Sequence, residues 1–265
     1  MKSLRELPGR SARPLQKMIK MNIYITDGTE NGFYSAAFFA CTDKHCIITS
    51  SSNWQIPLGA NIVCDAPDES HAERVRKKLC EYDRAALRDI SLLLRRGSDT
   101  REMTALEYLR LIVKTRGPVR DMLAQPAVLE ATAEIKKVTL EAHRFTGFLR
   151  FMEGESGVFY APFSPDNDIL ELIVPHFIRR LKTQPFVIHD TSRKTAALWN
   201  TRECLYTSTD EKVNICLSEY EQTFQNLWKE YYRSVNIQQR PHEKQMKGYM
   251  PVRYWKYMPE RHGSA

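Results

Sequence analysis

A change of residue period divides this sequence and constrains its fold more than any other feature. Before residue 142, apolar residues recur every three or four positions, as at Val75, Leu79 and Tyr82, which is the spacing of an amphipathic helix. After residue 142, short runs such as 158–163 are rich in aromatic and β-branched residues, which favour strands. The sequence therefore predicts an α+β protein, with a mainly helical N-terminal half followed by a mixed β-sheet.

The first half nevertheless opens with a strand. Alternating apolar residues predict a strand over 22–26, followed by a buried helix over 33–40. A second strand is predicted over 60–64. Helical spacing then predicts one long helix or a helix pair over 72–93, and further helices over 103–113 and 119–142. Pro126 is expected to kink or split the last of these, because proline lacks the backbone N–H that a helix interior needs.

The second half has a ββαββ pattern. Strands are predicted over 145–151 and 158–163, joined as a hairpin by a turn that contains Gly154 and Gly157. A helix starts after Ser164-Pro165-Asp166, and two more strands follow over 186–190 and 195–199.

A last long helix precedes the C-terminal segment. Ser218 and Glu221 have the spacing of a capping box. We expect a buried apolar stripe along this helix, formed by Phe224, Leu227, Trp228 and Tyr231.

Three segments follow from these patterns. Residues 1–20 are basic and poor in apolar residues, so we expect a disordered tail. Residues 21–142 are expected to form the helical part of a single domain, and residues 143–265 its sheet-containing part with a basic, aromatic C-terminal segment. The sequence has no internal repeat and no low-complexity linker.

The positive charge of the chain lies at its two ends. The net charge is +7, but residues 1–20 and 231–265 each carry +5, which leaves −3 for the rest. A phosphate-binding surface therefore has to involve an end of the chain. The C-terminal segment is the better candidate, because its cations interleave with aromatic rings that can stack on bases. The candidate residues are Arg233, Arg240, Lys247, Arg253, Tyr254, Trp255 and Lys256. The alternative is that the rings pack onto the domain and the charges only face water.

A second group of polar residues lies on the predicted strands. On a strand over 145–151 and its flanks, Arg144 and Arg150 would share one face near Tyr160, as an anion pocket or as surface ion pairs. His189 and Asp190 are neighbours on a strand and point to opposite faces, so they cannot form a catalytic dyad. Asp190 is expected to pair with Arg193 at the following turn. The candidate catalytic residues are His189, Arg150, Tyr160 and His143.

Several classes of site and protein are not supported by the sequence. No run approaches the roughly 20 apolar residues of a membrane-spanning helix, and the N-terminus has no signal-peptide core. The six cysteines form no Cys-x-x-Cys pair, so we expect no metal site. No glycine-rich phosphate loop or hydrolase motif is present. We therefore expect a cytoplasmic protein without a membrane anchor or cofactor.

Several motifs resemble those of one bacterial protein family. They are Tyr24-Ile-Thr-Asp-Gly28, His143-Arg-Phe-Thr-Gly-Phe-Leu-Arg-Phe151, Val187-Ile-His-Asp190 and Met250-Pro-Val-Arg-Tyr-Trp-Lys256. The family is one of DNA repair or DNA metabolism proteins, whose main domain is a domain of unknown function. The resemblance covers about residues 22–260 and implies no catalytic residues. It implies a radical-SAM protein encoded nearby as the partner and, in some members, fusion to a uracil-DNA glycosylase.

The function expected from charge and resemblance is a DNA repair or DNA modification protein that binds nucleic acid and acts with a radical-SAM partner. Two alternatives stay open. The chain is an enzyme that acts on a damaged base or nucleotide through a His/Arg/Tyr pocket, or it is a scaffold that binds the partner protein. The enzyme hypothesis requires His189, Arg150 and Tyr160 to approach one cavity.

Overall fold

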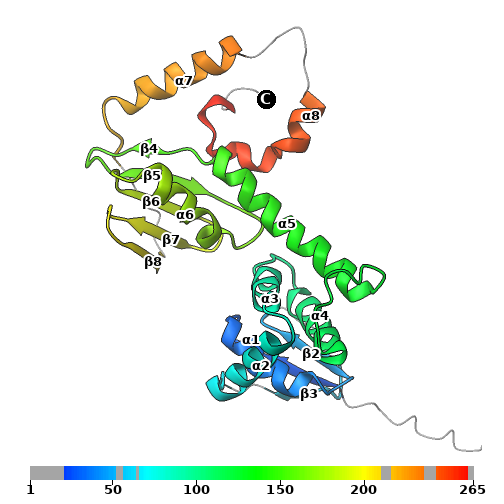
Figure 1. The fold of residues 1–265 in the computed structure, drawn as a ribbon. Helices are drawn as coiled ribbons and strands as arrows, with labels where there is room; N and C mark the ends of the chain where they lie inside the picture. The colour runs from blue at the N-terminus through cyan, green and yellow to red at the C-terminus, as the bar shows by residue number, and fades with distance from the viewer. Residues whose placement is uncertain (1–20, 52–55, 64–65, 210–215, 236–242, 262–265) are drawn as a thin grey trace, which may run out of the picture. The chain divides into compact units, whose positions relative to one another are not determined.

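The computed structural model describes residues 21–51, 56–63, 66–209, 216–235 and 243–261 (Figure 1). The chain divides into two compact units between Val75 and Arg76, inside α2 (Glu69–Tyr82). Two sequence predictions lie outside the described residues, namely the disordered tail over 1–20 and the candidate Arg240. Within the described residues, no helix combines the length and the apolar character needed to cross a membrane.

The first unit holds a small parallel sheet and the helix that follows its first strand. The strand order is β2 (Cys46–Thr49), β1 (Asn22–Ile25), β3 (Asn61–Val63), with α1 (Glu30–Ala40) after β1. Strands were predicted at β1 and β3 and are confirmed, whereas β2 was not predicted. Helix α1 begins where the Thr29 side chain accepts a hydrogen bond from the backbone N–H of Gly32, which is ordinary N-cap chemistry.

The second unit opens with helices. These are α3 (Ala86–Leu94), α4 (Arg101–Thr115) and α5 (Pro126–Phe148). The predicted long helix or helix pair is a pair, α2 and α3, separated by residues 83–85. Pro126 neither kinks nor splits a helix. It is the first residue of α5, where its missing N–H costs nothing and its fixed φ angle fits the helix.

A five-stranded mixed sheet follows, which confirms the predicted α+β fold. The order is β4 (Met152–Glu153), β5 (Phe159–Phe163), β6 (Phe186–Asp190), β7 (Thr195–Trp199) and β8 (Cys204–Ser208). Only β5 and β6 run parallel, joined by α6 (Leu170–Arg180), and the other pairs are antiparallel. Strands β6 and β7 have the predicted bounds. Strand β8 was not predicted.

The predicted strand over 145–151 is wrong. Helix α5 continues to Phe148, so the change of residue texture near 142 falls inside a helix. The buried residues Val138, Phe145 and Leu149 are spaced seven and four positions apart, which places them on one helical face. Burial against the core therefore decides the local structure, against the strand preference of the aromatic residues.

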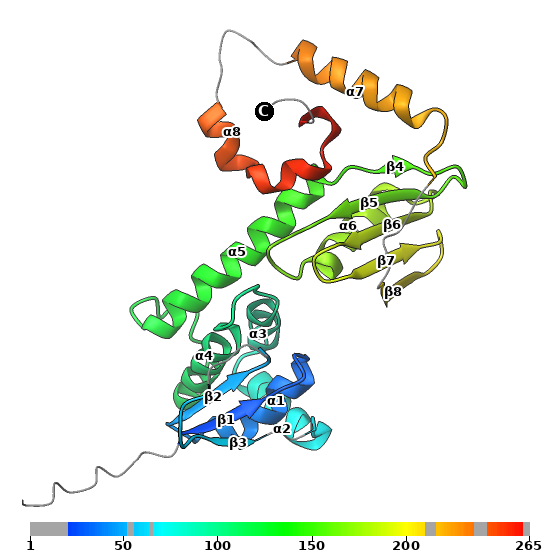
Figure 2. The ribbon, with the colours of Figure 1, turned by 180° about the vertical axis from the view of Figure 1, so that it is seen from behind.

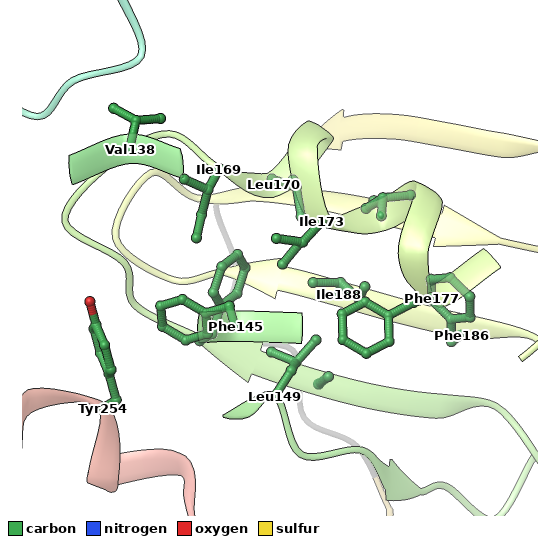
Figure 3. Close-up of a cluster of buried hydrophobic side chains, with 14 of the residues drawn as sticks. Val138, Phe145, Leu149, Ile169, Leu170, Ile173, Phe177, Phe186, Ile188 and Tyr254 are labelled. Atoms are coloured by element: carbon green, nitrogen blue, oxygen red, sulfur yellow. The ribbon is translucent and has the colours of Figure 1, made fainter. Parts of the chain in front are cut away.

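The core of the second unit lies where α5 and α6 pack on the sheet. Figure 3 shows Phe145 of α5 and Leu149, the residue after this helix, with Ile173 and Phe177 of α6 and Ile188 of β6 in one cluster. Tyr254, more than 100 positions along the chain from α5, packs on the same cluster, with its ring centroid 4.6 Å from that of Phe145. The C-terminal segment is therefore part of this core.

The last elements are α7 (Glu221–Val235), α8 (Glu243–Tyr249) and the short 3-10 helices η1 (Val252–Tyr257) and η2 (Pro259–Arg261). Both ribbon views place α7 beside β4 (Figures 1 and 2). The predicted capping box is wrong: the Glu221 carboxylate accepts a hydrogen bond from the backbone N–H of Glu153 at 2.8 Å, and Ser218 Oγ donates to the Glu153 carboxylate at 3.3 Å. The start of α7 is thus attached to the edge of the sheet.

The predicted buried stripe of α7 is also wrong. Phe224 and Leu227 are each 60% exposed, Tyr231 is 57% exposed and Trp228 is 39% exposed. An amphipathic period shows that a helix has an apolar face, but it does not show that the rest of the chain covers that face. Phe224 and Trp228 of this exposed face line a groove beside the sheet.

Candidate nucleic-acid interface

The two aromatic candidates of the C-terminal segment both contact the core of the domain. Tyr254 is 3% exposed and donates a 2.6 Å hydrogen bond from its hydroxyl to Glu141 Oε1. Burial, and then this bond to Glu141, raise the pKa of Tyr254. The indole N–H of Trp255 donates to the carbonyl oxygen of Met250 at 3.1 Å, and the ring packs on the core. The expectation that the Tyr254 ring stacks on bases is therefore corrected, because that ring is buried. Trp255 is half-buried, and its contacts attach the segment to the domain.

Glu141 is the buried acceptor that organises this attachment. Besides the Tyr254 hydroxyl, its carboxylate accepts from the backbone N–H of Asp166 and from the backbone and side-chain N–H groups of Asn167, at 2.6–2.9 Å. A buried carboxylate needs such donors, because it has lost its water. A second contact fixes α8, since Arg144 donates to the carbonyl oxygen of Gly248 at 3.0 Å.

The cations of the attached segment remain at the surface. Arg253 and Lys256 are three positions apart on η1, and such residues eclipse each other in a 3-10 helix. The side chain of Arg253 is 52% exposed and pairs with the equally accessible Asp166 at 2.6 Å. Lys256 and Lys247 are exposed as well. Arg233 lies on α7, where it makes only a loose 3.7 Å ion pair with Glu230.

An exposed ring lies at the end of α8. Tyr249 is 68% exposed, two positions after Lys247 and immediately before the segment that leads into η1. In contrast to the buried ring of Tyr254, this ring is accessible to a ligand.

The four candidate catalytic residues do not form one site. Tyr160 and His189 are brought together, with the Tyr160 hydroxyl 2.8 Å from His189 Nδ1, and both are buried. Burial raises the pKa of Tyr160 and lowers that of His189. His143, however, lies on α5 and is exposed. Arg150 has a separate set of contacts.

Arg150 follows α5 and makes contacts that exclude the predicted anion pocket with Arg144. Its Nε and Nη2 donate to Glu260 Oε1 at 3.0 and 2.6 Å, and its Nη1 donates to the carbonyl oxygen of Gly147 at 2.8 Å. Its guanidinium lies 5.3 Å from the centroid of the Trp228 ring. Burial alone would raise the pKa of Glu260, but the hydrogen bonds from Arg150 outweigh it and lower that pKa. Arg150 therefore joins α5, η2 and α7.

The turn after β6 holds the predicted Asp190 pair. Asp190 is fully buried and its carboxylate accepts from Arg193 Nη1 at 3.0 Å, which confirms that prediction. Burial raises the pKa of Asp190 in spite of this partner. The pair fixes a turn, because Arg193 also donates to the carbonyl oxygens of Pro165 and Asp166.

An open groove of about 690 Å³ lies between α7 and the edge of the sheet. Aromatic rings from β5, α6 and α7 line it, together with Phe151, which directly precedes β4. Among the polar lining residues are Arg180, Gln184 and Gln225. Neither Tyr160 nor His189 lines it, so this groove does not unite the residues that the enzyme hypothesis requires. Sequence reasoning missed the groove, because its lining comes from five separate segments.

Two buried acids, Glu141 and Glu260, were also missed. The only sequence signal for Glu141 is a charged residue on the apolar side of a helix, four positions before Phe145. No three His, Cys, Asp or Glu side chains of the described residues gather as metal ligands.

Comparison with known proteins gives one match. The family model described as a domain of unknown function, DUF4130, matches residues 99–260. This range includes the five-stranded sheet, the groove and the C-terminal segment. The comparisons with curated proteins and with solved structures gave no match.

Proposed function

The chain belongs to the DUF4130 family, and we propose that this domain binds nucleic acid through its basic C-terminal segment, as part of DNA repair or DNA modification. The observation that carries the proposal is the attachment of η1. On the buried side of η1, Tyr254 is hydrogen-bonded to Glu141. Arg253 and Lys256 share the outer side of the same short helix. Cations held in place by the core lose little conformational entropy on binding phosphate.

The ion pair of Arg253 does not oppose this function. Arg253 and Asp166 both have side chains about half exposed, and an exposed pair of this kind contributes only about 0–1 kcal/mol. A phosphate can therefore replace Asp166 at small cost, and it gains a charge-assisted hydrogen bond from the guanidinium. The exposed ring of Tyr249 offers a stacking face for an unpaired base beside these cations.

The family resemblance supports one further part of the proposal. We propose that the domain acts with a radical-SAM protein encoded nearby. We further propose that it acts in the cytoplasm. The sequence motifs support the partner, and the contacts described above are independent of it.

The test is fluorescence anisotropy with labelled single-stranded and duplex DNA. The variant Arg253→Ala with Lys256→Ala removes both η1 cations. The matched control is Arg179→Ala with Lys182→Ala, which removes two exposed cations near the end of α6. We expect at least about a tenfold loss of affinity in the first variant and a much smaller loss in the control.

Equal losses in both variants would show that binding follows only net charge, and absence of binding by the wild-type protein would refute the proposal. The partner is tested separately, by co-purification of the full chain with the radical-SAM protein after nuclease treatment. Co-purification that persists in the Arg253→Ala, Lys256→Ala variant, together with unchanged DNA affinity of that variant, would favour the scaffold alternative instead.

A further inference from the structure

The groove between α7 and the sheet edge has the size and lining of a ligand site. Its volume of about 690 Å³ is within the range of roughly 300–1,000 Å³ that is usual for small-molecule sites. Neither Arg253 nor Lys256 lines it. The proposed function therefore leaves it without a role.

Aromatic rings provide much of the apolar lining of the groove. Phe159 and Phe177 form part of its lining from the sheet and α6, and Phe224 and Trp228 line it from α7. Phe224 is 60% exposed and Trp228 is 39% exposed, so both rings are accessible to a ligand. A planar ring is the shape that such a surface accepts best, because offset stacking and apolar contact both favour it.

Most polar groups of the groove are already satisfied. Arg150 is bound to Glu260, and the Glu221 carboxylate accepts from the Glu153 backbone and from the side-chain amide of Gln225 at 2.9 Å. Arg180, at the end of α6, is exposed and has no ion-pair partner among the described residues. The groove thus presents one available cation, which selects a ligand with an anionic group.

The remaining polar groups suit the edge of a base. The Gln225 amide N–H₂ donates to Glu221, which leaves its carbonyl oxygen to accept from a ligand. Gln184 also lines the groove, and its side chain makes no hydrogen bond within the described parts of the chain. An amide offers a donor and an acceptor side by side, which is the pattern used to read nucleobase edges.

We propose that this groove binds an unpaired nucleotide, with the base against Phe224 and Trp228 and the phosphate at Arg180. That the nucleotide belongs to a bound DNA strand rests on the proposed function. The chemical class of the ligand is inferred from the lining of the groove alone. A free mononucleotide has the same chemistry, so the experiment includes both sources.

The first arm measures the affinity gained from one unpaired nucleotide. A duplex with a single bulged nucleotide is compared with the fully paired duplex, using the full-length protein. We expect the wild type to bind the bulged duplex at least about fivefold more tightly, as a stacked base typically provides. Phe224→Ala and Arg180→Ala should lose this gain. The matched controls are Leu227→Ala, which is equally exposed on α7, and Arg179→Ala, and neither residue lines the groove.

The second arm titrates the same proteins with 5′-dAMP by calorimetry. Binding by the wild type that Phe224→Ala abolishes supports the site, and if the bulged duplex shows no gain, the ligand is a free nucleotide. The Arg253→Ala, Lys256→Ala variant separates the two proposals, because it should weaken both duplexes equally and keep the gain. The inference is overturned if neither ligand shows an effect that depends on Phe224 and Arg180.

Discussion

Replacing Tyr254 with Phe removes one oxygen atom and tests whether the C-terminal segment is fastened as described. The lost group is the hydroxyl that donates to Glu141 Oε1 at 2.6 Å, between side chains that are 3% and 4% exposed. A hydrogen bond to a charged group contributes about 1.5–3 kcal/mol. We place Tyr254→Phe near 2 kcal/mol, because Oε1 keeps its second donor, the Asp166 backbone N–H.

Differential scanning calorimetry at neutral pH measures this effect. A loss of about 2 kcal/mol corresponds to a fall in Tm of roughly 4–8 °C for a unit of this size. Tyr249→Phe is the matched control, since the Tyr249 side chain is 68% exposed and its hydroxyl can bond to water. We expect no change in Tm for the control. Equal Tm values for wild type and Tyr254→Phe would refute the attachment through Glu141.

Three further outcomes follow from other contacts. Gly97→Ala should cost about 1–3 kcal/mol in chemical denaturation, because a Cβ there would overlap the carbonyl oxygen of Asp166; an unchanged midpoint would contradict this packing. Glu260→Gln should destabilise by about 2 kcal/mol at pH 7 by weakening the bonds from Arg150. Because the pKa of Glu260 is lowered from 4.5 in the folded state, this difference should shrink as pH falls below 4.5, and a difference constant down to pH 3 would argue against it. Burial lowers the pKa of His189 below 6.5, so the wild type should lose stability as pH falls through 6.5, and His189→Gln should lose less; parallel Tm curves would exclude this linkage.

Gly147→Ala is the control for the glycine prediction. A Cβ at Gly147 meets nothing within 4 Å, and alanine favours the helix by up to about 1 kcal/mol. We therefore expect Gly147→Ala to raise the denaturation midpoint slightly, in contrast to Gly97→Ala.

Local sequence patterns were sufficient to predict an element where its packing in the folded chain favours the same secondary structure as its residues do. Strands β6 and β7 have their predicted bounds: each contains a short apolar run, and most residues of β6 are buried in the sheet. The predicted strand over 145–151 was wrong, because the buried residues Phe145 and Leu149 continue the helical spacing that starts at Val138. In that stretch the aromatic residues favour a strand, whereas burial of one helical face favours a helix. The outcome depends on tertiary packing, which the local sequence does not reveal.

The candidate site was predictable in its charge but not in its geometry. The excess of cations in residues 231–265 is visible in the sequence, and four of the candidate cations, Arg233, Lys247, Arg253 and Lys256, are exposed. Tyr254 was misassigned because its partner Glu141 lies 113 positions away, and no local pattern reveals such a contact. The groove depends in the same way on segments that are distant in sequence.

The salt dependence of single-stranded DNA binding tests the central claim most directly. Each phosphate contact contributes about −0.7 to the slope of log K against log salt concentration. We predict that Arg253→Ala with Lys256→Ala makes this slope shallower by about 1.4, the share of two contacts. A slope that is the same in wild type and variant would show that these two cations do not contact phosphate.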